Sequence, residues 1–227
     1  MEDRSSEIKI LEILKDRCSS YAFLSQIYRE EVSSTLLAEM ANGLDLTVEE
    51  DTTGEGLRIL KDFARKLKRA DLKKVETELA TEYASLFLNG RNHSVFPYES
   101  VYTSKKRLVM QKARDEVLSE YRQEGLETPK EFNEPEDHIT IELEFMRHLC
   151  RKAVENMEQG NPEACLAYLR KQKEFLEKHL WVWIPNFCED LARTAQSDFY
   201  KGIAKVTGDY LSLEQETISE LIDELQS

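Results

Sequence analysis

The sequence predicts an all-α fold, a helical bundle of about ten helices, and three observations lead to this expectation. The chain of 227 residues has only 8 glycines and 5 prolines, about half the average usage, so few positions interrupt a helix. Charged residues make up 33% of the chain, which is typical of helices with solvated faces. Apolar residues recur three and four positions apart, and no segment alternates like a strand over a convincing length.

The first part of the chain reads as two helices followed by a polar loop. Over residues 5–31 the apolar side chains form one helical stripe, which predicts a long amphipathic helix. Ser33 can cap a second, short helix over residues 33–41, which Gly43 closes. Residues 45–56 are acidic and contain two glycines, so we expect a surface loop there.

The middle of the chain reads as three helices, predicted over residues 55–69, 71–88 and 104–124. Asp71 suits the N-cap of the second helix, and Gly125 ends the third. The segment that contains Pro97 lacks periodicity and is expected to be a loop. Residues 126–133 form a linker, which we interpret as a hinge between two helical subdomains.

The last part of the chain reads as five helices, predicted over residues 134–159, 162–179, 186–194, 197–207 and from 212 onward. Pro162 follows Asn161 at the first position of a helix, where its fixed φ is favourable. Ser212 and Gln215 fit a capping box. The expected organisation is an N-terminal helical subdomain, a hinge loop and a C-terminal helical subdomain, at residues 1–125, 126–133 and 134–227.

The charge of the chain disfavours some classes of partner. Its 31 Lys and Arg against 44 Asp and Glu give a formal net charge of −13, which opposes binding to the phosphate backbone of a nucleic acid. The longest apolar run, residues 180–184, is far shorter than the roughly 20 residues that cross a bilayer. The N-terminal segment lacks the apolar stretch of a secretory signal. The four cysteines are far apart and include no Cys-x-x-Cys pair, which favours reduced core thiols over a disulfide framework or a zinc site. We expect a cytoplasmic protein with no nucleic-acid partner and no membrane insertion.

Patterns for catalysis and cofactor binding are absent from the sequence. None of the 4 histidines follows a Glu by three positions, as a di-iron carboxylate bundle requires. No glycine-rich phosphate loop and no nucleophile elbow occur. Glu144 and His148 share one helix face, which is more typical of a surface interaction than of half a metal site. We therefore expect no metal, no cofactor and no catalytic residue.

An aromatic cluster is the first feature that suggests a binding function. Tyr83, Leu86 and Phe87 lie on one face of a predicted helix, and the loop after it contains Pro97 and Tyr98. Core packing would explain Leu86 and Phe87. The loop, however, offers more aromatic surface than a connection needs, and aromatic side chains are typical of peptide-binding grooves.

The second cluster is the segment Glu-Pro-Glu-Asp-His at residues 134–138. Pro135 suits a helix start, and acidic groups in a first turn are favoured by the helix dipole, so simple capping is one interpretation. The dipole would disfavour the charged form of His138, whereas Asp137 would favour it. The protonation of His138 therefore stays open at this point.

Taken in order, these motifs resemble the TorD/DmsD family of redox-enzyme maturation chaperones. Tyr-Ala-Ser-Leu-Phe at residues 83–87 resembles the family's aromatic-x-x-Leu-Phe motif. Pro-Tyr-Glu-Ser-Val-Tyr at residues 97–102 resembles its Pro-x-x-Ser-Val-Tyr/Trp segment, and residues 134–138 resemble its Glu-Pro-x-Asp-His motif. Residues 179–187, which contain two tryptophans and a proline, are similar to its C-terminal half.

The resemblance implies a non-catalytic cytoplasmic chaperone that binds the twin-arginine signal peptide of a molybdenum-cofactor oxidoreductase. It would hold the apo-form of the catalytic subunit until the cofactor is in place. An acidic chain with an apolar groove suits a leader with a basic front and an apolar middle. Carried over by position, the peptide-binding residues are Tyr83, Leu86, Phe87, Pro97, Tyr98, Ser100, Pro135, Asp137 and His138. Asp137 is the expected arginine partner.

Other interpretations remain beside this one. The chain could be a helical adaptor that binds the folded partner enzyme rather than its leader. It could also be an enzyme in which His138 is a general base that Asp137 or Glu134 orients. The resemblance also implies weak binding of a guanine nucleotide, although the chain lacks a phosphate loop. A domain-swapped dimer, exchanged at residues 126–133, is an alternative to a monomer.

Overall fold

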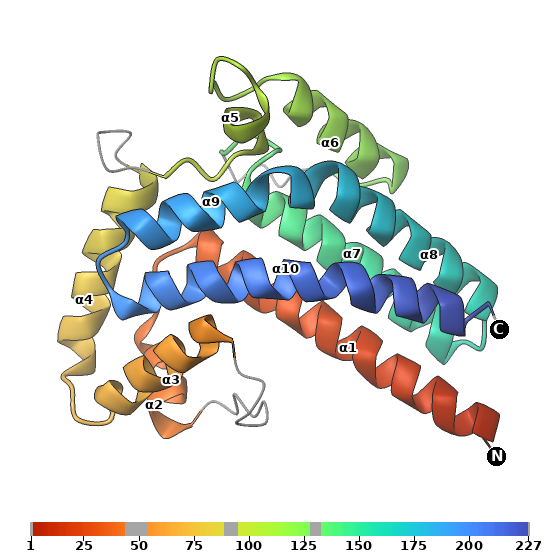
Figure 1. Cartoon of the computed structure of the whole chain (residues 1–227), viewed down its shortest axis with the longest axis horizontal. Coiled ribbons are helices and arrows are strands. Elements are labelled where there is room, and N and C mark those ends of the chain that lie inside the picture. The colour runs from red at the N-terminus through yellow and green to blue at the C-terminus, as the bar shows by residue number, and fades with distance from the viewer. Residues whose placement is uncertain (1, 44–53, 89–94, 128–132, 227) are drawn as a thin grey trace. The chain divides into compact units, whose positions relative to one another are not determined.

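The computed structural model describes residues 2–43, 54–88, 95–127 and 133–226, and within these ranges the fold is all-α, as predicted (Figure 1). The α-helices are α1 Glu2–Arg29, α2 Ser34–Asn42, α3 Glu55–Leu67, α4 Leu72–Tyr83, α5 Glu99–Thr103, α6 Lys112–Gln123, α7 Ile139–Glu158, α8 Pro162–Phe175, α9 Trp181–Thr194 and α10 Asp198–Glu224. Two π-helical turns, η1 Ala84–Leu88 and η2 Leu176–Leu180, follow α4 and α8. The predicted loop over 45–56 lies mostly outside the described residues.

Local capping signals in the sequence are confirmed at three helices. The Ser33 hydroxyl accepts a backbone N–H from the first turn of α2, and Gly43 closes this helix at a φ of 92°, a left-handed conformation that glycine adopts easily. The Asp71 carboxylate accepts two backbone N–H groups at the start of α4. Asn161 caps α8, with Pro162 at the first helical position.

Two helix starts differ from the prediction. The helix expected from residue 134 begins at Ile139, with His138 as its N-cap, because residues 134–138 form a turn that pairs with another segment. The helix expected over 104–124 is the shorter α6, and α5 precedes it. At residues 134–138 the pairing with residues 98–99 replaces helical hydrogen bonds, and before α6 the Gln111 backbone N–H donates to the Ser100 hydroxyl.

The C-terminal helices are longer than predicted. The helices expected over 197–207 and from 212 are one helix, α10. Ile203, Leu211 and Ile218 of this helix are all fully buried, so an apolar stripe runs through the predicted capping box at Ser212. Similarly, Pro185 lies inside α9 rather than at a break.

The chain forms two compact units, which are described separately. Unit 1 comprises Met1–Arg29, Tyr98–Trp183 and Leu211–Ser227, and unit 2 comprises Glu30–Pro97 and Ile184–Tyr210. The expected division at residues 126–133 differs from this one, because the chain on both sides of that linker belongs to unit 1. Residues 128–132 of the linker lie outside the described ranges.

Unit 1 is built around α7, which packs against both α1 and α8. Buried Arg17 of α1 donates through Nε to Glu214 Oε1 of α10 at 2.9 Å and through Nη2 to Gln172 of α8 at 2.7 Å. The Tyr21 hydroxyl donates to the same Glu214 carboxylate at 2.8 Å. A buried ion pair needs such additional hydrogen bonds to offset its desolvation. One apolar cluster of this unit comprises Ile10, Leu14, Ala153, Cys165, Leu169 and Leu221.

Unit 2 packs α2, α3 and α4 with residues 184–210. The rings of Phe63 and Phe199 lie 5.6 Å apart. Gly202 of α10 lies directly against α3, since a Cβ atom at this position would be 2.7 Å from the Leu60 side chain. The absence of a side chain at Gly202 therefore permits the two helices to approach closely.

Two further predictions concern the membrane and the cysteines. No helix in the described part of the chain combines the length and the apolarity that crossing a bilayer requires. All four cysteines are free thiols, and three of them are buried. The burial of three of them is what the interpretation as core thiols predicts.

Candidate functional site

The two motif segments of unit 1 lie against one another. Tyr98 and His138 form an antiparallel β-bridge, and the Glu99 backbone N–H donates to the Asp137 carbonyl oxygen at 3.0 Å. We call residues 98–100 together with residues 134–138 the motif junction. The junction explains why residues 134–138 are not helical, since backbone groups of this segment pair with residues 98–99.

Asp137 is the central buried residue of the motif junction. Its side chain is fully buried, and its Oδ2 atom accepts the backbone N–H of Ser100 at 2.8 Å. The Ser100 hydroxyl in turn accepts the backbone N–H of Gln111 at 3.0 Å. Asp137 thus fixes the start of α5 and, through Ser100, the end of the loop before α6. It does not face solvent, where a peptide arginine would approach.

His138 is the N-cap of α7. Its Nδ1 atom accepts the backbone N–H of Thr140 at 3.1 Å, and its ring packs edge-on against the Tyr98 ring at 5.1 Å. Burial lowers the pKa of His138 to about 3, because a charged imidazolium would lose its hydration. The ring is therefore neutral near pH 7, which answers the question that the sequence left open.

The more accessible side chains of the motif junction are Tyr98, Glu134 and Pro135, which are all half-buried. The Tyr98 hydroxyl donates to Glu134 Oε2 at 2.5 Å. Glu136 is half-buried as well, and it is held by Arg114, whose Nε and Nη2 atoms donate to its two oxygens at 2.5 and 2.9 Å. Partial burial opposes ionisation of Glu136, but the Arg114 hydrogen bonds outweigh it and lower the pKa of this carboxyl.

Two more buried carboxyl groups of unit 1, Glu99 and Glu142, lie close to Asp137. The Glu99 carboxylate is 3.0 Å from His179 Nδ1, and the Trp183 indole N–H donates to Glu142 Oε2 at 2.9 Å. Burial, followed by the charge of Glu99, raises the pKa of Glu142 well above its usual value. Across the described ranges, no three His, Cys, Asp or Glu side chains are grouped as metal ligands would be.

The predicted residues of unit 2 are mainly core residues. Tyr83 and Leu86 are 6% and 2% exposed, and Pro97 is buried as well. Phe87 is half-buried, with its ring 5.0 Å from that of Tyr83 and 6.5 Å from that of Phe187. Of the nine predicted residues, the structure therefore brings five together in the motif junction of unit 1 and places four in unit 2.

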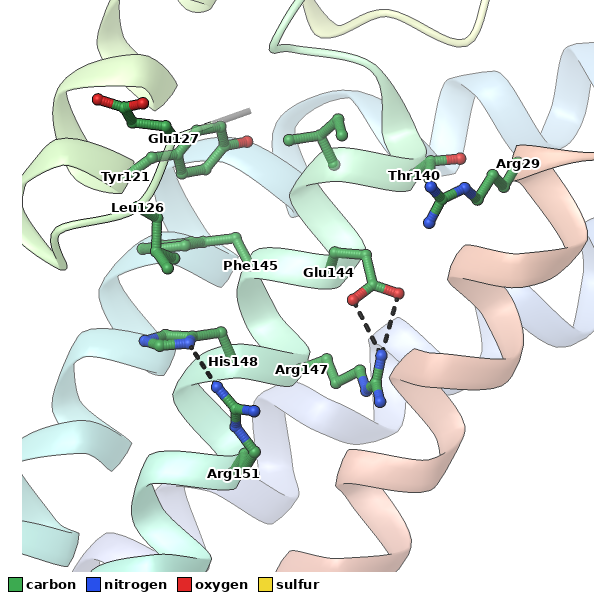
Figure 2. Close-up of a pocket in the computed structure, with 11 residues that line it drawn as sticks. Arg29, Tyr121, Leu126, Glu127, Thr140, Glu144, Phe145, Arg147, His148 and Arg151 are labelled. Atoms are coloured by element: carbon green, nitrogen blue, oxygen red, sulfur yellow. Dashed lines mark hydrogen bonds and ion pairs between the residues drawn. The ribbon is translucent and has the colours of Figure 1, made fainter. Parts of the chain in front are cut away.

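A pocket of about 280 Å³ in unit 1 was not predicted from the sequence (Figure 2). Its lining residues are Arg29, Tyr121, Leu126, Glu127, Thr140, Ile141, Glu144, Phe145, Arg147, His148 and Arg151. Tyr121 and Phe145 form an aromatic pair with ring centres 4.8 Å apart. Glu144 accepts from Arg147 at 3.1 Å and from the Ser25 hydroxyl at 2.9 Å.

The pocket adjoins the motif junction through Tyr121, because the Tyr121 hydroxyl donates to the Glu136 carbonyl oxygen at 3.1 Å. Much of its wall is one face of α7, where Thr140, Glu144 and His148 follow one another at intervals of four residues. The shared face of Glu144 and His148 was visible in the sequence. The aromatic pair that completes the pocket was not, because Tyr121 comes from a different helix.

Comparison with known proteins gives consistent matches over most of the chain. The family described as nitrate reductase delta subunit matches residues 49–189. The chaperone protein TorD of Vibrio cholerae is 29% identical over 225 residues, which cover 96% of this chain and 98% of that protein. The TorD proteins of Photobacterium profundum and Vibrio vulnificus are 27% and 25% identical, and each match covers 82% of this chain and 86% or 85% of the relative.

These relatives are named chaperones, which supports the prediction that the chain is not an enzyme. A solved structure from Archaeoglobus fulgidus, of a protein with a proposed role in redox enzyme maturation, is 22% identical. It covers 86% of this chain and 93% of its own, with a TM-score of 0.48.

Proposed function

Because the chain belongs to the nitrate reductase delta subunit family, we propose that it is a chaperone for the maturation of a molybdenum-cofactor oxidoreductase. It acts in the cytoplasm, where it binds the twin-arginine signal peptide of the catalytic subunit. It holds the apo-form of that subunit until the cofactor has been inserted and folding is complete. The TorD chaperones that match nearly the whole chain support this function.

The observation that carries the proposal is the motif junction with the pocket beside it. Two segments whose order resembles a signal-peptide chaperone meet in one place, although 36 residues separate Tyr98 from Glu134. Tyr121 connects the junction to a pocket with an aromatic pair. A peptide that lies across the junction could therefore place its apolar side chains in the pocket.

The apolar middle of the leader is the part that suits this pocket. Leu126 and Ile141 are half-buried and lie beside the aromatic pair, so they leave apolar surface for a ligand to cover. The arginines Arg147 and Arg151 also line the pocket. They make it unsuitable for the basic front of the peptide, which must lie elsewhere.

We assign the basic front of the leader to the half-buried carboxylate Glu134 and to the exposed Glu127, which lines the pocket. A guanidinium can pair with such a carboxylate in bidentate fashion. Asp137, the arginine partner expected from the motif, is fully buried and bonded to Ser100. Its proposed role is to hold the junction in shape rather than to contact arginine.

The residues of unit 2 contribute a second apolar surface to the proposal. Leu88 is 61% exposed and Phe96 is 39% exposed, on either side of a segment outside the described residues. Phe87, next to Leu88 in sequence, is half-buried and packs against the buried Tyr83 ring, and the Val95 backbone N–H donates to the Leu86 carbonyl oxygen, which brings the two segments together. We propose that this surface contacts an apolar portion of the client and that Pro97 fixes the chain next to Phe96.

The alternatives differ from this function in what the chain would bind. A helical adaptor would bind the folded partner without its leader. An enzyme with His138 as general base is disfavoured, because Nδ1 of that ring caps α7 and the side chain is buried. No phosphate-binding loop accompanies the arginines of the pocket, so guanine nucleotide binding has no support beyond the family resemblance.

The experiment is a calorimetric titration of the full-length chain with a synthetic twin-arginine leader. We expect Leu126→Ser, which removes apolar surface from the pocket, to weaken binding by about 1–3 kcal/mol. Leu72→Ser, at a half-buried leucine in unit 2, is the matched control and should bind like the unchanged chain. Equal binding by both variants would overturn the assignment of the pocket, and retention of a mature partner that lacks its leader would favour the adaptor.

A further inference from the structure

The loop between α5 and α6 exposes a basic segment followed directly by an apolar one. Residues 105–107 are Lys-Lys-Arg and residues 108–110 are Leu-Val-Met, and all six side chains are exposed. Leu108 is 51% exposed, Val109 40% and Met110 60%. Three consecutive large apolar residues at the surface are unusual, because burial of such side chains normally stabilises a fold.

The charge around this loop is opposite to that of the whole chain. Residues 100–114 contain five basic residues and no acidic one, whereas the chain carries a net charge of −13. With these five positive charges removed, the remainder carries −13 − 5 = −18. Lys112 and Arg114 pair with acidic neighbours. The positive charge at the tip of the loop therefore comes from residues 105–107.

The loop is held in a defined conformation despite its exposure. Ser104 donates its backbone N–H to the Ser100 carbonyl oxygen at 3.1 Å, and its hydroxyl accepts the Leu108 N–H at 3.3 Å. The Gln111 side chain donates to the Val109 carbonyl oxygen at 2.9 Å. These bonds, with the one from Gln111 to Ser100, connect both ends of the loop to α5.

Two residues of the loop adopt the left-handed conformation without being glycine. Arg107 has a φ of 50° and Met110 a φ of 56°, which is unfavourable for residues with a Cβ atom. Such outliers persist only where the surrounding structure enforces them, and they are often functional. Here the hydrogen bonds of Ser104 and Gln111 hold the apolar side chains in solvent at a cost in conformational energy.

We propose that residues 105–110 form a peripheral contact with an anionic lipid surface. The lysines would attract acidic headgroups, and Leu108, Val109 and Met110 would enter the interface between headgroups and acyl chains. The two adjacent lysines suit a lipid better than a protein, because protein interfaces are depleted in lysine, whereas anionic headgroups attract basic residues. The contact is reversible, since a few basic and apolar residues form only one weak anchor.

The test is co-sedimentation of the full-length chain with vesicles of phosphatidylglycerol and phosphatidylcholine, compared with vesicles of phosphatidylcholine alone. We expect several-fold more protein on the anionic vesicles at low ionic strength and loss of most of this excess at about 0.5 M salt, where charges are screened. Equal binding to both kinds of vesicle, or no binding to either, would overturn the proposal.

Two loop variants separate the contribution of the basic residues to vesicle binding from that of the apolar residues. Lys105→Glu with Lys106→Glu should abolish the preference for anionic vesicles, and serine at all three apolar positions should reduce binding several-fold. The matched controls are Lys68→Glu with Arg69→Glu, an exposed basic pair in unit 2, and Leu213→Ser, at a residue 58% exposed in unit 1. These controls should bind as the unchanged chain does.

Light scattering on the same variants tests the competing explanation, in which the loop binds a second copy of the chain. If the loop mediates contact between two copies of the chain, the serine variant will lose a concentration-dependent increase in mass, and its vesicle binding will be unchanged. That result would overturn the lipid contact. Circular dichroism on each variant checks that the helical content is retained, which we expect because none of the six side chains is buried.

Discussion

The Oδ2 atom of Asp137 accepts the backbone N–H of Ser100 at 2.8 Å across 37 positions of sequence. This bond unites the two motifs of unit 1, and it occupies one oxygen of the carboxylate that the sequence presented as an arginine partner. The Oδ1 atom of the same carboxylate is buried without a hydrogen-bond partner among the described residues. Asp137 therefore holds the geometry of the motif junction.

Substitution of Asp137 is expected to lower stability. Asp137→Ala leaves a buried N–H without its acceptor, which costs about 1–3 kcal/mol, whereas Asp137→Asn retains an acceptor oxygen and should cost less. Urea denaturation followed by circular dichroism measures both. If Asp137→Ala unfolds at the same urea concentration as the unchanged chain but loses peptide binding, the carboxylate contacts the peptide after all.

His138 should make stability depend on pH. Its pKa is about 3 in the folded chain, against an ordinary value of 6.5, so between these values only the unfolded chain binds the proton. The free energy of unfolding should therefore fall by about 1.4 kcal/mol for each pH unit below 6.5 from this residue alone. His138→Asn, which can still cap α7, should remove that part of the slope in denaturation curves between pH 7 and 4.5. An unchanged slope would mean that His138 is protonated in the folded chain.

Glu142 should make the stability of the chain depend on pH in the opposite direction. Its pKa is raised above the ordinary value of 4.5, so above pH 4.5 the unfolded chain releases a proton that the folded chain retains, and stability falls as pH rises towards the folded pKa. Glu142→Gln removes this loss and keeps an oxygen for the Trp183 indole. We expect the variant to be more stable than the unchanged chain at pH 7.5, with a difference that shrinks towards pH 4.5. A variant that is less stable at pH 7.5 would show that the ionised carboxylate is the favoured form.

The parts of the fold that depend on local chemistry were predictable from sequence. Asn161 and Pro162 predicted the start of α8, and Asp71 predicted the start of α4. The capping box at Ser212 was misleading, because a local signal does not interrupt a helix whose apolar stripe is buried on both sides of it.

The site was predictable only in part. The order of the motifs identified Tyr98 and residues 134–138 as important, but their pairing is a long-range contact that spacing alone does not specify. Burial has the same character, because the local sequence does not show that the polar side chains of Asp137 and His138 are enclosed in the folded chain. The same holds for α1 and the end of α10, which belong to one unit and are joined by the hydrogen bond between Arg17 and Glu214, 197 positions apart.

The central claim is that accessible carboxylates beside the pocket recognise the arginines of a signal peptide. The most direct measurement is a double-mutant cycle by calorimetry, in which the twin-arginine leader and its double-glutamine version are each titrated into the unchanged chain and into Glu134→Gln. We predict that each change alone weakens binding by about 1–3 kcal/mol and that the two effects are not additive, because they remove the same contact. Equal affinity of the unchanged chain for both peptides would contradict the claim.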